Sequence, residues 1–121
     1  MQVFLAKFLK PGSVPRFELG RIVATPGALA LMHETNSNPF VLLARHVTGD
    51  WGDVDPEDFQ TNEDSVMHGA RVLSVYRLPL QDTGSKAASS AVDARDDSDD
   101  RIWLITEADR SVTTLLLPEE Y

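Results

Sequence analysis

A short polar residue stands directly before a proline three times in the first half of the chain. A threonine, asparagine or aspartate side chain can cap the free amides at the start of a helix, and proline at the first helical position loses no hydrogen bond. Three such pairs therefore predict three successive helix starts. The pairs are Thr25-Pro26, Asn38-Pro39 and Asp55-Pro56.

Apolar residues recur at helical spacing after each of these starts. The first predicted helix spans Pro26 to about Glu34, before a turn at 36–38. The second ends near Gly49, and the third ends at Gly69 after an acidic first turn, which the positive end of a helix dipole favours. The residues expected to be buried are Leu29, Met32 and part of Ala28 in the first helix, Phe40, Leu43 and Val47 in the second, and Phe59, Val66 and Met67 in the third.

The hydrophobic period changes from three or four residues to two after Gly69. Alternation over Val72–Leu78 and Ile102–Glu107 predicts two strands, and Val112–Leu117 predicts a third. The residues Ala108-Asp109-Arg110 are few enough to form a hairpin between the last two. Helices followed by strands predict an α+β fold, in which two to three proline-led helices pack on a C-terminal antiparallel three-stranded meander.

Segments outside this pattern complete the expected organisation. Met1–Phe8 is typical of a short apolar strand or docking arm, and Phe17–Ala24 of a short strand that follows a loop. Residues 81–100 are mostly Asp, Ser, Ala and Gly, with Val92 as their sizeable apolar residue. Such a segment cannot bury enough surface to order itself, so a flexible acidic hairpin insertion is predicted there. The chain 1–121 is expected to be a single domain.

The composition excludes several classes of protein. The 121 residues include no cysteine, which excludes disulfide scaffolds, zinc fingers, iron–sulfur clusters and thiol chemistry. The longest apolar runs, such as Val3–Ala6 and Leu115–Leu117, fall far below the roughly 18 residues of a membrane span. The first residues lack the basic and long apolar regions of a signal peptide, so a cytoplasmic location without membrane contact is expected.

The formal net charge of −8 is distributed unevenly. Residues 1–49 carry five basic and two acidic residues, whereas residues 50–64 carry seven acidic residues and no basic one. A nucleic-acid backbone is bound by clustered Lys and Arg, so the charge disfavours nucleic acid as a partner. The acidic block at 50–64 is a candidate contact surface for another protein. The predicted binding residues are Arg45, Trp51, Asp53, Asp55, Glu57 and Asp58.

The densest polar stretch lies at the end of the second predicted helix. In one interpretation it is a catalytic loop, with His46 as acid and base, Asp50 as its orienting partner and Trp51 as a surface for a ligand. In the other, Arg45 and His46 lie at the negative end of a helix that Gly49 caps, and Trp51 fills the core. Both interpretations stay open on the sequence.

A second group of candidate catalytic residues lies on the predicted strands. Arg71, Tyr76 and Thr106 can share one sheet face with His46 nearby. A cation that stabilises a pentavalent phosphate beside an acid/base pair is what a metal-independent ribonuclease needs. The same residue types are also tolerated on any half-exposed strand face. That face would further carry Ser74, Arg77, Arg110, Thr113 and Thr114.

No pattern in the sequence predicts a metal ion or a cofactor. His33, His46 and His68 lack the spacing that places two imidazoles on one ion. The run Asp96–Asp100 lacks the glycine and the bidentate glutamate of an EF-hand loop. The motifs of nucleoside triphosphate, dinucleotide and serine-hydrolase sites are also missing from the chain.

Five blocks of the sequence have a familiar pattern, namely Phe17–Leu29, Leu42–His46, Gly49–Gly52, Ile105–Ser111 and Leu117–Tyr121. With these blocks the chain resembles small bacterial proteins labelled "plasmid-related protein", which are carried on plasmids and integrative elements. The resemblance implies a mobile-element setting and no established catalytic residues. Some members are labelled as a modification subunit of a type I restriction enzyme, but Asn38-Pro39-Phe40 is one proline short of the adenine methyltransferase motif.

The function expected from these observations is that of a small accessory protein of a mobile element, acting by protein–protein contacts without catalysis. One alternative is a metal-independent ribonuclease toxin of the barnase–EndoU–colicin–RelE type that uses His46, Arg71, Tyr76 and Thr106. A second alternative is an antitoxin-like or DNA-binding regulator. The exposed edge of the predicted meander is a candidate homodimer surface.

Overall fold

The proline-led helix starts are confirmed in the computed structural model, which describes residue 9, residues 12–79 and residues 100–121. The helices of these residues are α2 (Pro26–Glu34), α3 (Pro39–Val47) and α4 (Pro56–His68). Each begins directly after the residue expected to cap it. Each cap side chain accepts a hydrogen bond from a backbone amide of its helix. Thr25 accepts from the Ala28 amide at 3.2 Å, Asn38 from the Phe40 amide at 2.8 Å, and Asp55 from the Asp58 amide at 3.0 Å.

Two predicted segments cannot be compared with the structure. The strand or docking arm at Met1–Phe8 lies outside the described residues. The insertion predicted at 81–100 lies outside them as well, except for Asp100.

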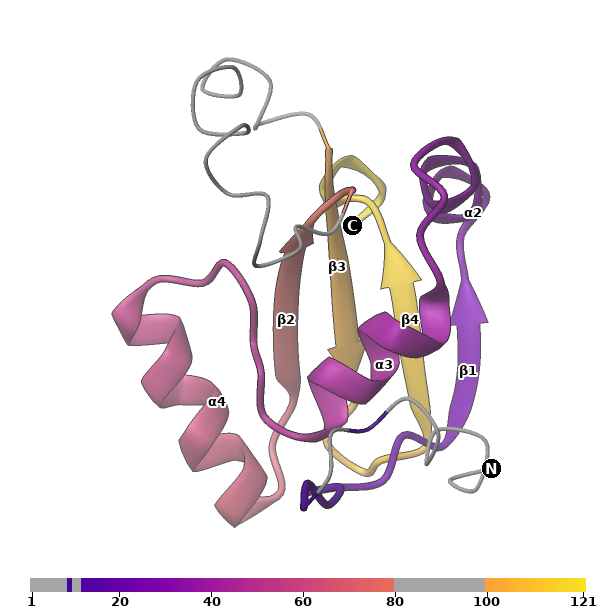
Figure 1. Ribbon diagram of the computed structural model, residues 1–121. Coiled ribbons are helices and arrows are strands. Elements are labelled where there is room, and N and C mark those ends of the chain that lie inside the picture. The colour runs from indigo at the N-terminus through magenta and orange to yellow at the C-terminus, as the bar shows by residue number, and fades with distance from the viewer. Residues whose placement is uncertain (1–8, 10–11, 80–99) are drawn as a thin grey trace.

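The predicted meander is confirmed, and a fourth strand extends it (Figure 1). Strands β2 (Val72–Arg77), β3 (Arg101–Thr106) and β4 (Val112–Leu116) pair antiparallel, and a short helical turn η5 (Pro118–Glu120) follows. Strand β1 (Arg21–Ala24) lies beside β4 and runs parallel to it. The order across the sheet is β1-β4-β3-β2, so the architecture is α+β with a mixed sheet.

Strand β1 is shorter than predicted, because it begins at Arg21 and not at Phe17. Gly20 has a φ of +67°, and a Cβ atom at this position would lie 2.4 Å from backbone atoms of Arg110 and Ser111. Only glycine allows the chain to turn this closely against the hairpin between β3 and β4. The preceding Phe17 joins the hydrophobic core instead of the sheet.

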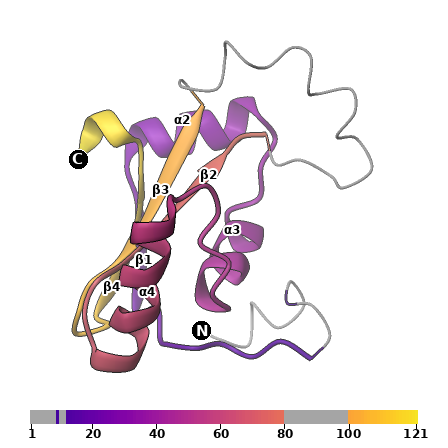
Figure 2. The same cartoon turned by 90° about the vertical axis from the view of Figure 1, so that its left-hand side faces the viewer.

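Helix α3 covers one face of the sheet, and η5 lies on the other side (Figure 2). The inner side of α3 packs on the sheet through Leu42, Leu43 and Val47, all fully buried. Two residues predicted to be buried are not, since Leu29 is 56% exposed and Phe40 is partly exposed at 38%. The remaining core residues are Phe17, Leu19, Ala28, Met32, Trp51, Val72, Tyr76, Leu78, Ile102, Leu104 and Leu115.

Helix α4 stands beside the sheet at the β2 edge and not over its face (Figure 1). The apolar face predicted for it is therefore wrong in two places, because Phe59 is 49% exposed and Met67 is 76% exposed. The buried residues of α4 are the polar Asn62 and Ser65, while Val66 packs against the core in part. A helix that meets a strand edge faces backbone groups, which polar side chains satisfy and apolar ones do not.

The outer edge of β2 is occupied by the chain's own polar groups. The Asn62 side chain donates to the Leu73 carbonyl at 2.7 Å and accepts the Leu73 amide at 3.0 Å. The Val75 amide donates to the Trp51 carbonyl at 3.0 Å, and its carbonyl accepts the Asp53 amide at 2.6 Å. Since β1 covers β4, both edges of the predicted meander are covered within the described residues.

Candidate functional site

The centre of the predicted site is a buried histidine. His46 projects from α3 into the core and is 0% exposed. Its Nδ1 lies 2.5 Å from the Ser74 hydroxyl, and its Nε2 lies 2.9 Å from the Thr106 hydroxyl. The rings of Phe17 and Trp51 meet the imidazole edge to face, at centroid distances of 5.2 Å and 5.9 Å. His46 is thus enclosed by its own fold.

A chain of hydrogen bonds sets the tautomer of His46. The Thr113 hydroxyl must donate to the Leu19 carbonyl at 2.7 Å, because a carbonyl can only accept. It then accepts from the Thr106 hydroxyl at 2.7 Å, and Thr106 in turn accepts from Nε2 of His46. The proton of the neutral imidazole therefore sits on Nε2, and Nδ1 accepts from Ser74. Every polar atom of this chain has a partner, which is what lets it lie in the core.

Burial also determines the charge of His46. Removal from water, together with the positive charge of Arg110, lowers the imidazole pKa from 6.5 to about 3. The ring is neutral at physiological pH and has no contact with solvent. A general acid or base must reach its substrate, so the geometry gives the predicted catalytic role of His46 no support.

Asp50 does not orient His46, as the catalytic interpretation required. Its carboxylate accepts from the Arg45 guanidinium at 2.7 Å and from the Gly52 amide at 3.2 Å. Its carbonyl accepts from the Tyr76 hydroxyl at 2.6 Å. Tyr76 is buried, which raises its pKa, and the Arg45 guanidinium stacks 4.7 Å from its ring centroid. Arg45, Asp50 and Tyr76 together hold the loop after α3 in place.

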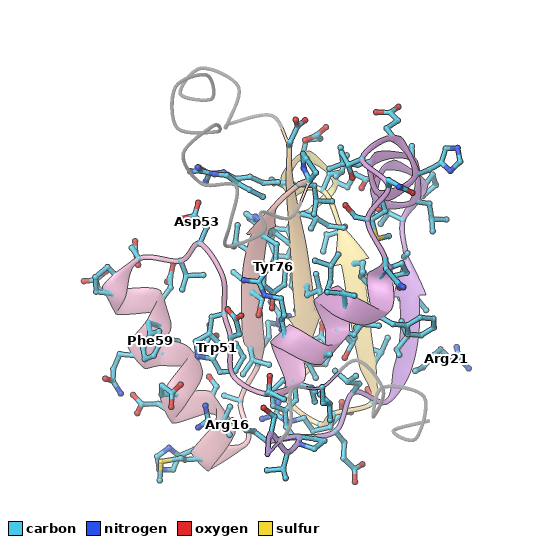
Figure 3. All side chains as sticks on the ribbon, in the orientation of Figure 1. Arg16, Arg21, Trp51, Asp53, Phe59 and Tyr76 are labelled. Carbon is cyan, nitrogen blue, oxygen red and sulfur yellow. The ribbon has the colours of Figure 1, made fainter. Side chains whose placement is uncertain are left out.

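Trp51 lies in the core, as the second sequence interpretation proposed. The side chain is 2% exposed and stacks on Phe17 at a centroid distance of 6.1 Å. Its indole nitrogen donates to the Glu63 carboxylate at 3.0 Å, and Arg16 binds the same carboxylate at 3.0 Å. Figure 3 shows Trp51 between α4 and the sheet, where it links the two. Trp51 has no surface to offer a ligand.

The remaining catalytic candidates are not gathered into one exposed site. Thr106 is buried with His46, but Arg71 lies outside β2 on the surface. The Arg71 guanidinium binds the Glu107 carboxylate at 3.2 Å and the Tyr121 hydroxyl at 2.9 Å. Tyr76 and Thr106 do share one sheet face with His46 beside them, but that face is buried in the core. The prediction is wrong for Arg71, which directly precedes Val72 and therefore lies off that face.

The acidic block divides into residues that stabilise the fold and residues that face water. Asp53 binds Arg77 at 3.1 Å and Arg101 at 3.5 Å. Asp55 caps α4, and Glu63 binds Arg16. These acids are therefore engaged within the protein. The acids of α4 that stay exposed without an ion pair in the described part of the chain are Glu57, Asp58 and Asp64.

Sequence reasoning missed the structural roles of Asn62 and of the buried hydroxyl groups. Ser74 lies between Val72 and Tyr76 in the same alternating set, so its burial could have been inferred from the apolar face of that strand. Thr113 shares a face with Leu115 in the same way. The role of Asn62 had no sequence signal, because it depends on the strand edge that α4 meets in space.

The described residues include no group of three or more His, Asp or Glu side chains that could hold a metal ion. Among the helices of those residues, none has the length and apolar character needed to cross a bilayer. No family model, no curated protein and no solved structure matches the chain.

Proposed function

We propose that this protein is a small accessory protein that acts by binding another protein, and that the outer side of α4 is the binding surface. The resemblance to plasmid-related proteins supports a bacterial mobile element as the setting, and the first residues, which lack the pattern of a signal peptide, support the cytoplasm as the location. No catalytic step is part of this proposal.

The exposed side chains of α4 carry the proposal. The helix has four acidic residues and no Lys or Arg over Pro56–His68. Two large apolar side chains stand among these acids, Phe59 at 49% exposure and Met67 at 76%. Aromatic residues and methionine are enriched in protein interfaces. We call the surface formed by Glu57, Asp58, Phe59, Asp64 and Met67 the α4 surface.

The attachment of α4 leaves this surface available. The helix is bound to the body through Asn62, Glu63 and Ser65, whose side chains or backbone meet β2, Trp51 and Arg110. None of the residues of the α4 surface takes part in those bonds. A partner could therefore cover Phe59 and Met67 without displacing α4 from the sheet.

The chemistry of the surface defines the partner. The three carboxylates that form no ion pair with other described residues attract a basic surface and raise the rate of encounter. Phe59 supplies an anchor that fits an apolar pocket. The same carboxylates repel a nucleic-acid backbone. A protein with a basic rim around an apolar pocket is the partner that this surface fits.

The experiment compares two charge reversals in the full chain. The variant Glu57→Lys/Asp58→Lys/Asp64→Lys changes the α4 surface, and the control Glu18→Lys/Glu34→Lys/Glu119→Lys makes the same change in net charge at exposed positions elsewhere. Tagged proteins are used to capture partners from nuclease-treated host lysate at low and high salt. We expect a protein that the wild type and the control retain at low salt, and that the α4 variant loses.

A second pair of variants tests the apolar anchor. Phe59→Ala should weaken capture of the same protein, whereas Val14→Ala, at a residue that is 68% exposed in a different region, should not. Equal capture by both charge variants would refute the proposal. Cleavage of RNA by the purified wild type, or binding to DNA at physiological salt, would favour the ribonuclease or the regulator instead.

A further inference from the structure

Among the described residues, the sheet edge that no other strand covers belongs to β1. The amides of Arg21 and Thr25 donate to carbonyls of the β4 side, at 2.9 Å to Ser111 and 3.0 Å to Leu115. Successive residues of a strand point their backbone groups to opposite sides, so those of Ile22 and Ala24 point away from β4. β1 is the last strand in the sheet order, and the described residues supply no partner for these outward groups.

We propose that a second copy of this chain pairs with the β1 edge, antiparallel, with Val23 opposite Val23 of the other copy. The two sheets then join into one continuous sheet. This surface is separate from the α4 surface, so the inference does not depend on the proposed function.

The register follows from the positions of the outward groups. With Val23 on the twofold axis, Ile22 of one copy is opposite Ala24 of the other, and each such pair exchanges two backbone hydrogen bonds. A shift of two residues in either direction pairs Ile22 with Ile22, or Ala24 with Ala24, and leaves the other residue outside the paired segment. The register centred on Val23 is therefore the one that satisfies all the outward groups of the described strand.

Charge complementarity favours a second copy over an unrelated strand. In this register Arg21 lies opposite Thr25 of the other copy, on the same face of the sheet. Arg21 is exposed and forms no ion pair with the described residues. The Thr25 hydroxyl binds the Glu120 carboxylate, which also accepts the amides of Gly27 at 3.1 Å and Leu117 at 2.9 Å. Neither Arg21 nor Glu120 forms an ion pair within the described residues, so each copy presents a cation to an oriented anion of the other, twice by symmetry.

Apolar side chains line the same edge on both faces. Val23 is 38% exposed and would contact its counterpart on the axis, since residues of a pair without hydrogen bonds lie about 4.5 Å apart at Cα. On the α3 face, Leu29 is 56% exposed beside a groove of about 190 Å³. That groove is formed by Ile22, Ala24, Met32, Phe40, Leu43 and Leu115 together with Val23, Leu29 and Pro39. Pairing at β1 would remove this apolar surface from water.

The first experiment removes one outward amide without touching the sheet within one copy. In Ala24→Pro the lost N–H is not used for pairing with β4, so the monomer should fold. Sedimentation velocity from micromolar to submillimolar concentration should show the wild type shifting toward a dimer, and Ala24→Pro staying a monomer. Circular dichroism and a thermal melt check that the variant is folded. A wild type that is monomeric over the whole range, or a folded Ala24→Pro that dimerises like the wild type, overturns the inference.

The second experiment tests the register through charge. Arg21→Glu places a carboxylate against Glu120 of the other copy, and should weaken dimerisation at least tenfold, more at low salt than at high salt. The control Gln60→Glu/Thr61→Glu makes the same change in net charge on α4 and should dimerise like the wild type. An equal effect of both variants would refute the proposed register. Protection of the Ile22 and Ala24 amides from hydrogen exchange should rise with protein concentration, and protection that is independent of concentration would count against the pairing.

Discussion

Helices α3 and α4 start with the same kind of cap and proline, but different interactions hold them in place. Helix α3 buries Leu42, Leu43, Ala44, His46 and Val47 against the sheet. Helix α4 is longer and buries only Asn62 and Ser65. A helix start of this kind determines where a helix forms but not which side of the fold the helix covers.

The difference divides the molecule into a part that maintains the fold and a part that is available to a partner. On α3, a complete polar chain through His46 lies within an apolar core, so most changes there should reduce stability. On α4, the bonds to the body use polar groups near the middle of the helix, and its large apolar residues face solvent. Changes on its outer side should affect binding and leave stability nearly unchanged.

The largest expected effect comes from truncation of the α3 core. Leu43→Ala should lower the free energy of unfolding by about 3 kcal/mol, because Leu43 is fully buried and its loss leaves a cavity. Phe59→Ala, which removes a larger side chain from α4, should change it by less than about 0.5 kcal/mol. Urea denaturation of both variants measures the contrast. Similar losses of unfolding free energy in Leu43→Ala and Phe59→Ala would show that α4 packs more tightly than the exposure of its side chains indicates.

The second expected effect is a loss of stability in mild acid that originates in α3. The unfolded chain protonates this imidazole below pH 6.5, whereas folded His46 stays neutral down to its pKa of about 3. Stability should therefore fall as the pH drops from 6.5 toward 3, by about 1.4 kcal/mol per pH unit and about 2 kcal/mol by pH 5.

Urea denaturation at pH 8, 7, 6 and 5 measures this dependence. The variant His46→Gln removes the titrating group and should have a flat profile from pH 7 to 5, at a lower stability throughout. A flat profile in the wild type would contradict the buried neutral state of His46 without reference to any variant.

The third and smallest effect tests how α4 is attached. Asn62→Ala leaves both backbone groups of Leu73 without their partner and should cost about 1.5 kcal/mol. Gln60→Ala removes an exposed side chain of the same helix and should cost less than about 0.5 kcal/mol. In Asn62→Ala, the rate of amide hydrogen exchange should increase, relative to the wild type, more in α4 than in α3. Equal exchange in the two helices would mean that Asn62 does not determine the attachment of α4.

The local elements of the fold could be predicted because their signals are local. The caps at Thr25, Asn38 and Asp55, the stops at Gly49 and Gly69, and the change of period after Gly69 depend on neighbours along the chain. The parallel pairing of β1 with β4 joins segments that are far apart in the sequence, and no local pattern encodes it. The start of β1 at Arg21 likewise depends on contact between Gly20 and the distant hairpin.

The candidate site could be predicted only as a set of residues. The sequence singled out His46, Tyr76 and Thr106, and the structure does bring all of them into the core beneath α3 or beside it. The role assigned to these residues changed from catalytic to structural, because burial depends on the whole fold. A histidine at a helix end can be a solvent-exposed base or a core residue. His46 can be a core residue because the strands bring the hydroxyl groups of Ser74 and Thr106 to its two ring nitrogens, and this placement depends on the tertiary structure.

By itself the sequence determined the helix starts, the meander and the position of the acidic block, since capping, alternation and charge are properties of neighbouring residues. Only the tertiary structure decided which groups are buried and, among the described residues, which acids lack an ion pair and which sheet edge no strand covers. These are properties of residues distant in the chain, whose hydrogen bonds and exposure exist only once α3 lies on the sheet and α4 lies at its edge.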